Sequence, residues 1–446
     1  MHWERLLSLQ KMGVTEKRQR KNDDETRIGF EKDYDRVIFS AAFRSLQDKT
    51  QVIPLSQKSF VHTRLTHSLE VSVVGRSLGR LVGRKVLDNH PELEKEFGYS
   101  FNDFGSVVAA ASLAHDIGNP PFGHSGERAM GDYFALGKGK RFQQMLTDEE
   151  YADLVDFEGN ANGFKILTES RDGAIGGLRL TYATLGAFMK YPKESLPKKP
   201  TSHIADKKFG VFQSEVPYFT EVVKDLGLLP RATGGYARHP LAFLVEAADD
   251  ICYTIIDFED GINLGLISEE VALEYLLNLV RNNLRKETYS RLTTPQKRLA
   301  YLRSLAINTL VEETANNFIA NEKAILDGTF SKALLVHSAY DAQIKDILKI
   351  SREKIYQSVE VRDKELAGYA ILNLLLDKFT TAVENYNNGQ NNSYDDLLLR
   401  TMSYSLSPEQ KTYTYLMEVC GFISQLTDGN ALQIYKQIKG QPYDKC

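Results

Sequence analysis

Cysteine is scarce in this sequence. Three of the 446 residues are cysteines, and they lie far apart, at Cys252, Cys420 and Cys446. No two of them form a CxxC pair, so we expect neither a disulfide framework nor a thiolate zinc site. Since free thiols persist in a reducing environment, the composition predicts a cytoplasmic protein.

Long apolar segments and an excess of one charge are also missing. The N-terminal stretch MHWERLLSLQKMGVTEKRQRK lacks the apolar segment of about 7–15 residues that a signal peptide needs. No run of about 18 apolar residues occurs elsewhere, so no membrane span is expected. With 55 Lys and Arg against 59 Asp and Glu, the net charge is −4. That balance gives no reason to expect a general nucleic-acid binder, although it is compatible with a local basic patch.

Strand patterns are sparse, whereas apolar residues recur at i, i+3, i+4 and i+7 over long windows, which predicts a mainly α-helical protein. The hydrophobic share of 42% is sufficient for a sizeable core. We expect helices over residues 67–87, 104–116 and 240–260. The predicted division is a helical core over residues 1–265, followed by a helical C-terminal region, residues 266–446, packed on it.

Proline, glycine and serine mark the expected helix ends. Pro240 is predicted to start the third of these helices and Gly261 to lie just past its end. The GNPPFG turn after residue 117 should end the second helix, and Ser125 should cap the next one. Pro295 and Pro408 are each predicted to open a later helix.

The histidines are unevenly distributed. Five of the nine fall within one window of 63 residues. They are His62, His67, His90, His115 and His124. His115 precedes Asp116 at the expected end of a buried helix, where the pair can offer a nitrogen and a carboxylate oxygen to a divalent metal. His67 can add a second imidazole. A His-Asp pair alone is more often an ordinary hydrogen-bonded pair, and His62 and His90 are given no role.

A polar face is predicted on the helix that begins at Pro240. Asp249, Tyr253 and Asp257 are spaced i, i+4 and i+8, so they share one face. Because their neighbours are apolar, this face is expected to border a polar cavity. Asp249 could supply a further metal ligand. Asp250 is the competing residue, although it is turned by about 100° from that face, and the pair could equally lie on a solvated surface.

These residues carry a resemblance to a known family. His67, His115-Asp116 and Asp249 resemble the H…HD…D pattern of the HD-domain metal-dependent phosphohydrolases. The stretch HDIGNPPFGHSGE resembles, more particularly, the deoxynucleoside triphosphate triphosphohydrolases of bacterial dGTPase type. Further similar stretches are DYDRVIFSAAFRSLQDKTQV, HTRLTHSLEV, FEGNANGFKIL, KKFGVFQSE and EAADDICYTIIDFEDG. The likeness spans residues 20–265 and is weak afterwards. There MEVCGFISQLTDGNAL resembles the closing helix of the family, with Gly421 where Asp is common.

The resemblance implies an all-α HD-type catalytic core with additional C-terminal helices. It also implies metal-dependent hydrolysis of dGTP, or of other dNTPs, to a deoxynucleoside and inorganic triphosphate by attack at the α-phosphorus. The implied metal ligands are His67, His115, Asp116 and Asp249. Two imidazoles and two carboxylates suit Mn²⁺, Fe²⁺ or Zn²⁺, whereas Mg²⁺ prefers more oxygen ligands. The expected ion is Mn²⁺, with Mg²⁺ or Fe²⁺ as alternatives.

The resemblance assigns His124 and Glu127 as the catalytic pair. His124 would donate a proton to O5′ while Glu127 orients it and holds its charge, although a role of His124 as base or nucleophile stays open. The alternative for Glu127 is a first-turn acid that favours the helix dipole.

Substrate contacts follow from the same resemblance. Arg64 would bind the phosphates, and Lys208, with Lys207, would neutralise the outer phosphates from the Lys-rich loop 190–208. The alternative is that this loop is simply solvated. The deoxyribose would be held by three residues, which are Gln51, Tyr253 and Asp257.

Two other functions compete with this one. The first is another HD-type phosphohydrolase, acting on alarmones or cyclic dinucleotides, and GNPPFGH followed by Glu127 argues against it. The second is a non-catalytic nucleotide sensor or nucleic-acid-binding regulator, which need not retain all four ligands and His124. Family members are homo-oligomers, often hexamers. An allosteric nucleotide or a single-stranded DNA effector is compatible with the sequence but has no visible signal in it.

Overall fold

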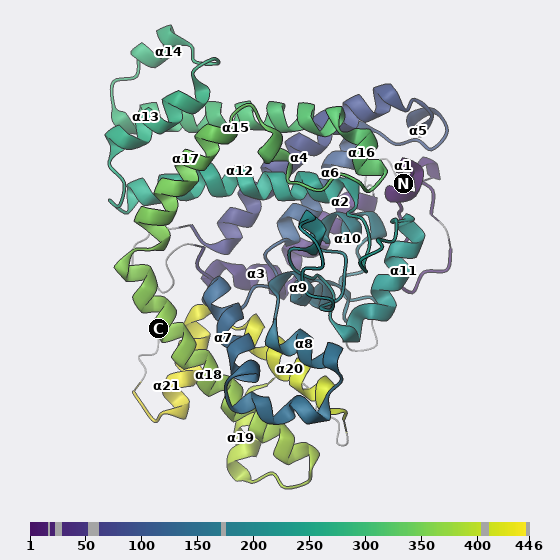
Figure 1. The fold of residues 1–446 in the computed structure, drawn as a ribbon, viewed down its shortest axis with the longest axis vertical. Helices are drawn as coiled ribbons and strands as arrows, with labels where there is room; N and C mark the ends of the chain where they lie inside the picture. The colour runs from purple at the N-terminus through teal and green to yellow at the C-terminus, as the bar shows by residue number, and fades with distance from the viewer. Residues whose placement is uncertain (17, 23–28, 52–61, 171–174, 403–409, 443–446) are drawn as a thin grey trace.

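The computed structural model describes residues 1–446 except 17, 23–28, 52–61, 171–174, 403–409 and 443–446. Within these described residues the regular structure is helical, and no strand is formed (Figure 1). Only two isolated β-bridges occur there, Thr50 with Thr63 and Pro230 with Tyr236. The predicted all-α fold is therefore confirmed.

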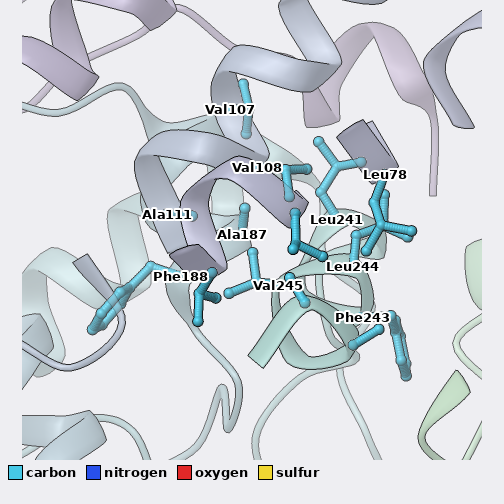
Figure 2. Packing of buried hydrophobic residues seen from close by; sticks show 14 of the residues in the cluster. Leu78, Val107, Val108, Ala111, Ala187, Phe188, Leu241, Phe243, Leu244 and Val245 are labelled. Atoms are coloured by element: carbon cyan, nitrogen blue, oxygen red, sulfur yellow. The ribbon is translucent and has the colours of Figure 1, made fainter. Parts of the chain in front are cut away.

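The centre of the fold is formed by three helices, α4 (Arg64–Asn89), α6 (Phe101–Ala114) and α12 (Pro240–Asn263). They are flanked by α2 (Gly29–Phe39), α10 (Tyr182–Phe188) and α15 (Pro295–Ala320). Figure 2 shows how hydrophobic side chains from α4, α6, α10 and α12 meet in one core. All three central helices were expected, with boundaries that differ by a few residues.

The contact between α4 and α6 depends on glycine. Gly75, Gly79 and Gly83 follow one another at a spacing of four, which places them on one face of α4. A Cβ at Gly79 would lie 2.6 Å from the carbonyl oxygen of Phe104 and 2.9 Å from the Cα of Gly105. The two backbones therefore approach more closely than any larger residue would permit, and His67 and His115 are brought near each other.

Two predicted helix boundaries were wrong. Gly261 lies inside α12, where a Cβ would approach Ile355 to 2.5 Å, so this glycine serves close packing and the helix ends before Gly265. The helix after the GNPPFG turn, α7 (Gly123–Ala135), begins two residues before Ser125. Its N-cap is Phe122, which has a left-handed φ of 63°. Local sequence predicts no such conformation for a phenylalanine.

Other boundaries agree with the prediction. Pro240 opens α12, and His239 caps it by accepting a hydrogen bond from the Leu241 backbone N–H. Pro295 opens α15, and the Thr294 side chain caps it at Lys297. The helix start predicted at Pro408 lies outside the described residues.

Residues beyond 265 contribute to two hydrophobic cores. The helices α13 (Glu269–Val280), α15 and α17 (Asp341–Ser351) extend the core around α4 and α12. The second core joins α7 and α8 (Asp148–Val155) to α18 (Val359–Asn387), α19 (Ser393–Thr401), α20 (Thr412–Gln425) and α21 (Asp428–Ile438). This second group occupies the lower half of Figure 1. The division at residue 265 remains a prediction.

The remaining α-helices have at most 11 residues each. They are α1 (Trp3–Leu6), α3 (Ala41–Arg44), α5 (Glu92–Lys95), α9 (Gly159–Thr168), α11 (Val216–Leu226), α14 (Lys286–Ser290) and α16 (Glu322–Leu326). Helix α18 is long and apolar enough to cross a membrane by length and composition alone, but half of its apolar window is buried within the protein. Its contacts with α7, α19 and α20 account for that apolar surface.

Candidate metal and nucleotide site

A polar cavity of about 600 Å³ opens where α4, α7 and α12 meet the end of α6 and the loop 190–208. Besides the competing Asp250, the sequence analysis names twelve site residues, and eleven of them line this cavity. They are Gln51, Arg64, His67, His115, Asp116, His124, Lys207, Lys208, Asp249, Tyr253 and Asp257. The twelfth, Glu127, is hydrogen-bonded to His124.

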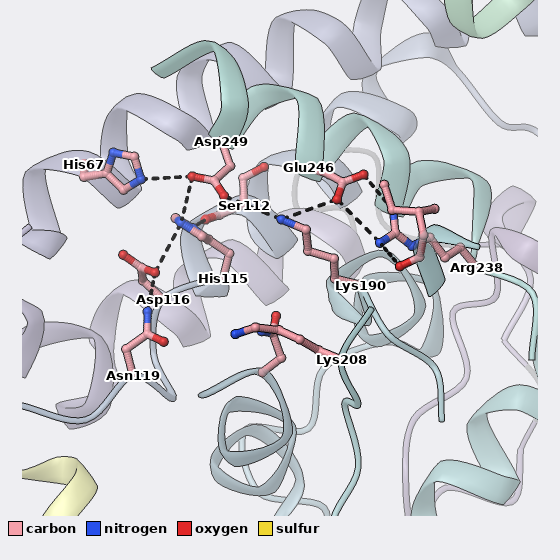
Figure 3. Close-up of polar contacts among 12 residues, drawn as sticks. His67, Ser112, His115, Asp116, Asn119, Lys190, Lys208, Arg238, Glu246 and Asp249 are labelled. Carbon is pink, nitrogen blue, oxygen red and sulfur yellow. Dashed lines mark hydrogen bonds and ion pairs between the residues drawn. The ribbon is translucent and has the colours of Figure 1, made fainter. Parts of the chain in front are cut away.

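The four predicted metal ligands gather at one wall of the cavity (Figure 3). One donor atom each from His67, His115 and Asp116 lies within 4.8 Å of the others. The Oδ1 atom of Asp249 is 3.2 Å from Nε2 of His67 and 3.7 Å from Nε2 of His115. This set of two imidazole nitrogens and two carboxylates fits a first-row divalent metal.

Neighbouring groups fix how these ligands are presented. Nδ1 of His115 lies 2.7 Å from the carbonyl oxygen of Ser112, which can only accept, so Nδ1 carries the proton. Nε2 of His115 is then free to bind a metal, an arrangement typical of ligating histidines. Asp116 accepts hydrogen bonds from Asn119 at 2.5 Å and from Nη1 of Arg64 at 2.8 Å. The ligands are therefore oriented by the protein itself.

Both carboxylates at this wall are ionised. Burial alone would raise the pKa of Asp116, but Arg64 and the imidazoles of His115 and His67 outweigh it and lower that pKa to about 2. The pKa of Asp249 is likewise lowered, since the bond with His67 and the nearby His115 and Lys190 overcome the effect of burial. Charged carboxylates are the form that a metal requires.

Asp249 and Asp250 differ in their surroundings. Asp249 lies beside both imidazoles, as its shared face with Tyr253 and Asp257 predicted. Asp250 also reaches the cavity, but burial raises its pKa to about 7 despite the nearby Lys190. Asp249 is therefore the better-placed candidate ligand.

His124 and Glu127 form a hydrogen-bonded pair. Nδ1 of His124 is 2.8 Å from Oε2 of Glu127, while Oε1 of Glu127 accepts from the Gly159 backbone N–H at 2.8 Å. Burial would raise the pKa of Glu127, but the bond with His124 and the charge of Lys208 lower it to about 2. Because the carboxylate is ionised, Nδ1 of His124 donates the proton, which leaves Nε2 to act on a substrate.

The predicted phosphate-binding residues are partly engaged. Arg64 is paired with Asp116, and the buried side chain has no partner for its Nε atom among the described residues. Nζ of Lys208 lies 2.8 Å from Glu158 and 3.7 Å from Glu127. Both cations line the cavity while they are paired with carboxylates.

Lys190 is a cavity residue that was not predicted individually. Its Nζ lies 3.5 Å from Oε1 of Glu246 and 3.8 Å from Oδ2 of Asp249. Burial would lower the pKa of Lys190, but Glu246 and Asp249 outweigh it and raise that pKa. Glu246 in turn is paired at 2.6 Å with Arg238, which is fully buried (Figure 3). The Lys-rich composition of the loop was the available signal, but it does not single out this position.

Tyr356 is a second residue that was missed. Its hydroxyl donates to Oδ2 of Asp257 at 2.5 Å, and its ring stacks on Tyr253 with centroids 5.5 Å apart at 8°. Burial raises the pKa of Asp257 to about 7, even though His67 and the Tyr356 hydroxyl act to lower it. Tyr356 ends a π-helical segment, Arg352–Tyr356, in which the sequence shows no motif. No sequence signal therefore pointed to it.

The chain is similar to known proteins over almost its whole length. The HD domain model matches residues 64–185. A deoxyguanosinetriphosphate triphosphohydrolase-like protein of Synechocystis sp. is 39% identical over 449 residues, 99% of both chains. A protein of the same name from Pseudomonas aeruginosa (strain LESB58) is 39% identical over 452 residues, again 99% of both. The deoxyguanosinetriphosphate triphosphohydrolase of Klebsiella pneumoniae (strain 342) is 34% identical over 393 residues, covering 78% of this chain and 76% of that one.

Proposed function

Because this chain belongs to the deoxyguanosinetriphosphate triphosphohydrolase-like family of HD-domain proteins, we propose that it hydrolyses dGTP to deoxyguanosine and inorganic triphosphate. Other dNTPs are the alternative substrates. The observation that carries the proposal is the cavity itself. It brings the cluster of His67, His115, Asp116 and Asp249 together with His124 and with a pocket formed by Tyr253 and Asp257.

The histidine and aspartate cluster would hold a divalent metal ion, for which Mn²⁺ is our first choice by ligand type. When bound, such an ion polarises a phosphoryl oxygen and makes water more acidic. Within the protein, Arg64 supplies a fork of donors suited to phosphate oxygens. Its pairing with Asp116 keeps that fork beside the cluster, where the α-phosphate is expected.

His124 is the proposed proton donor to O5′ as the deoxynucleoside leaves. A general acid must keep a proton available and then tolerate its loss. The buried carboxylate of Glu127 supports this role, because its hydrogen bond with Nδ1 orients the ring and leaves Nε2 to face a substrate oxygen. The His124 side chain is 76% exposed toward the cavity, so a substrate oxygen can approach it.

The triphosphate tail would extend along the lysines of the loop 190–208. Nζ atoms of Lys190 and Lys208 already line the cavity. Both are held by carboxylates, Lys190 by Glu246 and Lys208 by Glu158. These carboxylates set the lysine directions and compensate their charge before substrate binds.

The deoxyribose would bind at Asp257. Its Oδ1 atom is buried and has no hydrogen-bond partner among the described residues, whereas Oδ2 accepts from Tyr356. A buried acceptor without a partner is costly, so a 3′-hydroxyl is a fitting donor for it. The stacked rings of Tyr253 and Tyr356 would close the space near C2′.

A nucleotide panel tests the proposal directly. The four dNTPs, the four NTPs, an alarmone and a cyclic dinucleotide are each incubated with the protein and Mn²⁺. Their hydrolysis products, including nucleoside and inorganic triphosphate, are quantified, and nucleotide binding is measured separately by calorimetry. We expect release of both from dGTP. Hydrolysis confined to an alarmone or a cyclic dinucleotide would indicate the competing phosphohydrolase, and nucleotide binding without turnover would indicate a sensor.

Three further properties stay predictions: the cytoplasmic location, expected from the composition, the oligomeric state, implied by the resemblance, and a single-stranded DNA effector, which has no signal in the sequence. We infer a cytoplasmic homo-oligomer, for which a hexamer is the expected form, and light scattering measures its mass. A single-stranded DNA effector is the remaining candidate partner. It is tested by adding an oligonucleotide to the dGTP assay and measuring the change in KM.

A further inference from the structure

The corner between α20 and α21 contacts the turn that carries the catalytic histidine. Asp428, the first residue of α21, is only 2% exposed. Its Oδ1 atom accepts from the Phe122 backbone N–H at 2.9 Å. Its Oδ2 atom accepts from the backbone N–H of Thr50 at 3.2 Å and from the Thr50 hydroxyl at 3.0 Å. One buried carboxylate from the C-terminal region therefore joins two separate segments of the site.

The segment that holds Phe122 is conformationally demanding. Phe122 and the next residue, Gly123, both have positive φ, of 63° and 59°. For a residue with a Cβ this conformation costs roughly 1–2 kcal/mol, so its surroundings must stabilise it. The Phe122 ring packs against Gly368 of α18, where a Cβ would come within 2.7 Å of the ring. The hydrogen bond to Asp428 supplies the backbone part of this support.

The direction of His124 depends on this support. His124 is the second residue of α7, immediately after the left-handed pair. Its side chain is 76% exposed, so packing does not fix it. The backbone at Phe122 and the hydrogen bond with Glu127 therefore determine where Nε2 lies in the cavity.

A second contact ties the first half of the same turn to the same corner. Lys49 is 1% exposed, and its Nζ donates to the carbonyl oxygens of Asn119 and Ser424, each at 2.7 Å. The Asn162 side chain donates to the carbonyl oxygen of Gly118 at 2.8 Å and to the Ser424 hydroxyl at 2.9 Å. Both ends of the turn are thus held by the residues where α20 meets α21.

The other partner of Asp428, Thr50, adjoins the sugar end of the site. Thr50 forms a β-bridge with Thr63, the residue that caps α4. The neighbouring Gln51 is the predicted sugar contact and lines the cavity. The Arg64 backbone N–H donates to the carbonyl oxygen of Lys49 at 2.9 Å. Movement of Thr50 would therefore displace Gln51 and Arg64 together.

We propose that Asp428 is a positioning residue for the hydrolysis, an inference that rests on the proposed function. By holding Phe122 and Thr50 on one carboxylate, Asp428 sets His124 against the leaving oxygen and Gln51 against the sugar. It touches no substrate. Its effect is measurable because a misplacement of about 1 Å at a reacting group costs on the order of 10²-fold in rate.

The primary test is Asp428→Asn, which keeps the side-chain volume. Asparagine has one acceptor oxygen, so it can accept from the backbone N–H of Phe122 or from that of Thr50 but not from both, and its NH₂ group would face the other backbone N–H. We expect normal metal content and a kcat for dGTP lowered by about 10–10²-fold. Asp395→Asn is the matched control, because Asp395 is a buried carboxylate of the same region that bonds only residues of α18 and the start of α19 in the described structure. That variant should retain kcat.

A double mutant separates positioning from general stabilisation. In a His124→Ala background, where the positioned group is gone, Asp428→Asn should lower kcat by less than about twofold, because coupled residues are not additive. Independent, multiplying losses would overturn the proposal. So would an Asp428→Asn protein with a lowered Tm but unchanged kcat per folded molecule.

A milder variant guards against misfolding. Thr50→Val removes only the hydroxyl donor to Asp428, and we expect a higher KM for dGTP through Gln51. If Asp428→Asn fails to fold, an unchanged KM in Thr50→Val contradicts the proposal.

A wild-type protein that releases triphosphate from no dNTP overturns the proposed function as well. A wild-type protein that is active, with an unaffected Asp428→Asn variant, overturns the positioning role alone.

Discussion

Single residues of the cavity wall decide whether a metal can bind. His115 presents Nε2 toward Asp116 and Asp249 because its Nδ1 proton is committed to the Ser112 carbonyl oxygen. Removing this imidazole leaves the His67 nitrogen beside the two carboxylates. We expect this smaller donor set to bind a first-row divalent metal more weakly.

We predict that His115→Ala loses its bound metal, because each residue that binds the ion directly contributes to the affinity. Its rate of dGTP hydrolysis should fall by at least about 10²-fold. Metal content is measured by mass spectrometry on protein purified with Mn²⁺. His90→Ala is the matched control, because His90 pairs with Glu322 away from the cavity. Normal metal and turnover in His115→Ala would show that the ion is held elsewhere.

Variants of Asp257 and Tyr253, which share one face of α12, should distinguish nucleotide binding from discrimination between deoxyribose and ribose. Asp257→Ala removes a contact shared by ribose and deoxyribose, so it should weaken dGTP and GTP alike. Tyr253→Ala should weaken dGTP but narrow the difference between dGTP and GTP, because it removes a ring from the space near C2′. We measure kcat/KM for both nucleotides. An unchanged dGTP/GTP ratio in Tyr253→Ala would place the barrier elsewhere, with Gln51 the next candidate.

At the scale of helices, the periodicity of the sequence was informative where one face of a helix borders a single environment, such as a polar cavity. The spacing of Asp249, Tyr253 and Asp257 predicted a common cavity, and all three line it. Local signals failed where tertiary contacts set the backbone. Ser125 looked like a helix cap, but α7 begins at Gly123 because Phe122 takes a left-handed conformation that distant residues support.

The packing of α4 on α6 gives a prediction at this scale. Gly79→Ala should lower the free energy of unfolding by about 1–3 kcal/mol, the usual cost of forcing an extra methyl into a packed interface. The obstacle is the Phe104 carbonyl oxygen, 2.6 Å from the new Cβ, and backbone cannot rotate away as a side chain can.

Urea unfolding of Gly79→Ala measures this cost. Ser77→Ala is the control, because Ser77 is an exposed residue of the same helix and its loss should change stability by less than about 0.5 kcal/mol. Equal stability of Gly79→Ala and wild type would mean that the two helices can separate without cost.

At the scale of the whole molecule, the site is assembled from parts that no local pattern connects. Lys190 comes from a loop, Tyr356 from a π-helical segment, and Asp428 from the last described helix. Each reaches the cavity or its turn only through the folded chain. The sequence pointed to the motif residues that line the cavity, because metal and acid–base chemistry restrict residue type and spacing. It did not point to Lys190, Tyr356 and Asp428, because nothing in the sequence alone ties their positions to the cavity.

A buried polar cluster also links distant parts of the chain. Glu215, at the end of a short 3₁₀ turn (Gln213–Glu215), is 4% exposed and lies 3.6 Å from Lys165 of α9. Beside it, Asp153 of α8 accepts from the Tyr413 hydroxyl of α20 at 2.5 Å. Burial raises the pKa of Asp153 to about 6. The hydrogen bond between Asp153 and Tyr413 therefore joins α8 to α20.

The pH dependence of stability follows from Glu215. Burial raises the pKa of Glu215 to about 7, despite Lys165, from an ordinary value of 4.5. Between these two values the folded protein binds more protons than the unfolded chain, so stability should fall as pH rises from about 4.5 to about 7 and then level off. Glu215→Gln removes this titration. The free energy of unfolding of Glu215→Gln, relative to wild type, should therefore be about 1–3 kcal/mol higher at pH 8 than at pH 4.5.

Urea unfolding of wild type and Glu215→Gln at both pH values measures the difference. Exposed Glu149 is the control position, where Glu149→Gln should act equally at both. If the free energies of unfolding of wild type and Glu215→Gln differ by the same amount at pH 4.5 and pH 8, the Glu215 carboxyl is not protonated preferentially in the folded state. Glu215 would then stay ionised and paired with Lys165 over this pH range. The contacts among α8, α9 and α20 would not respond to pH through Glu215.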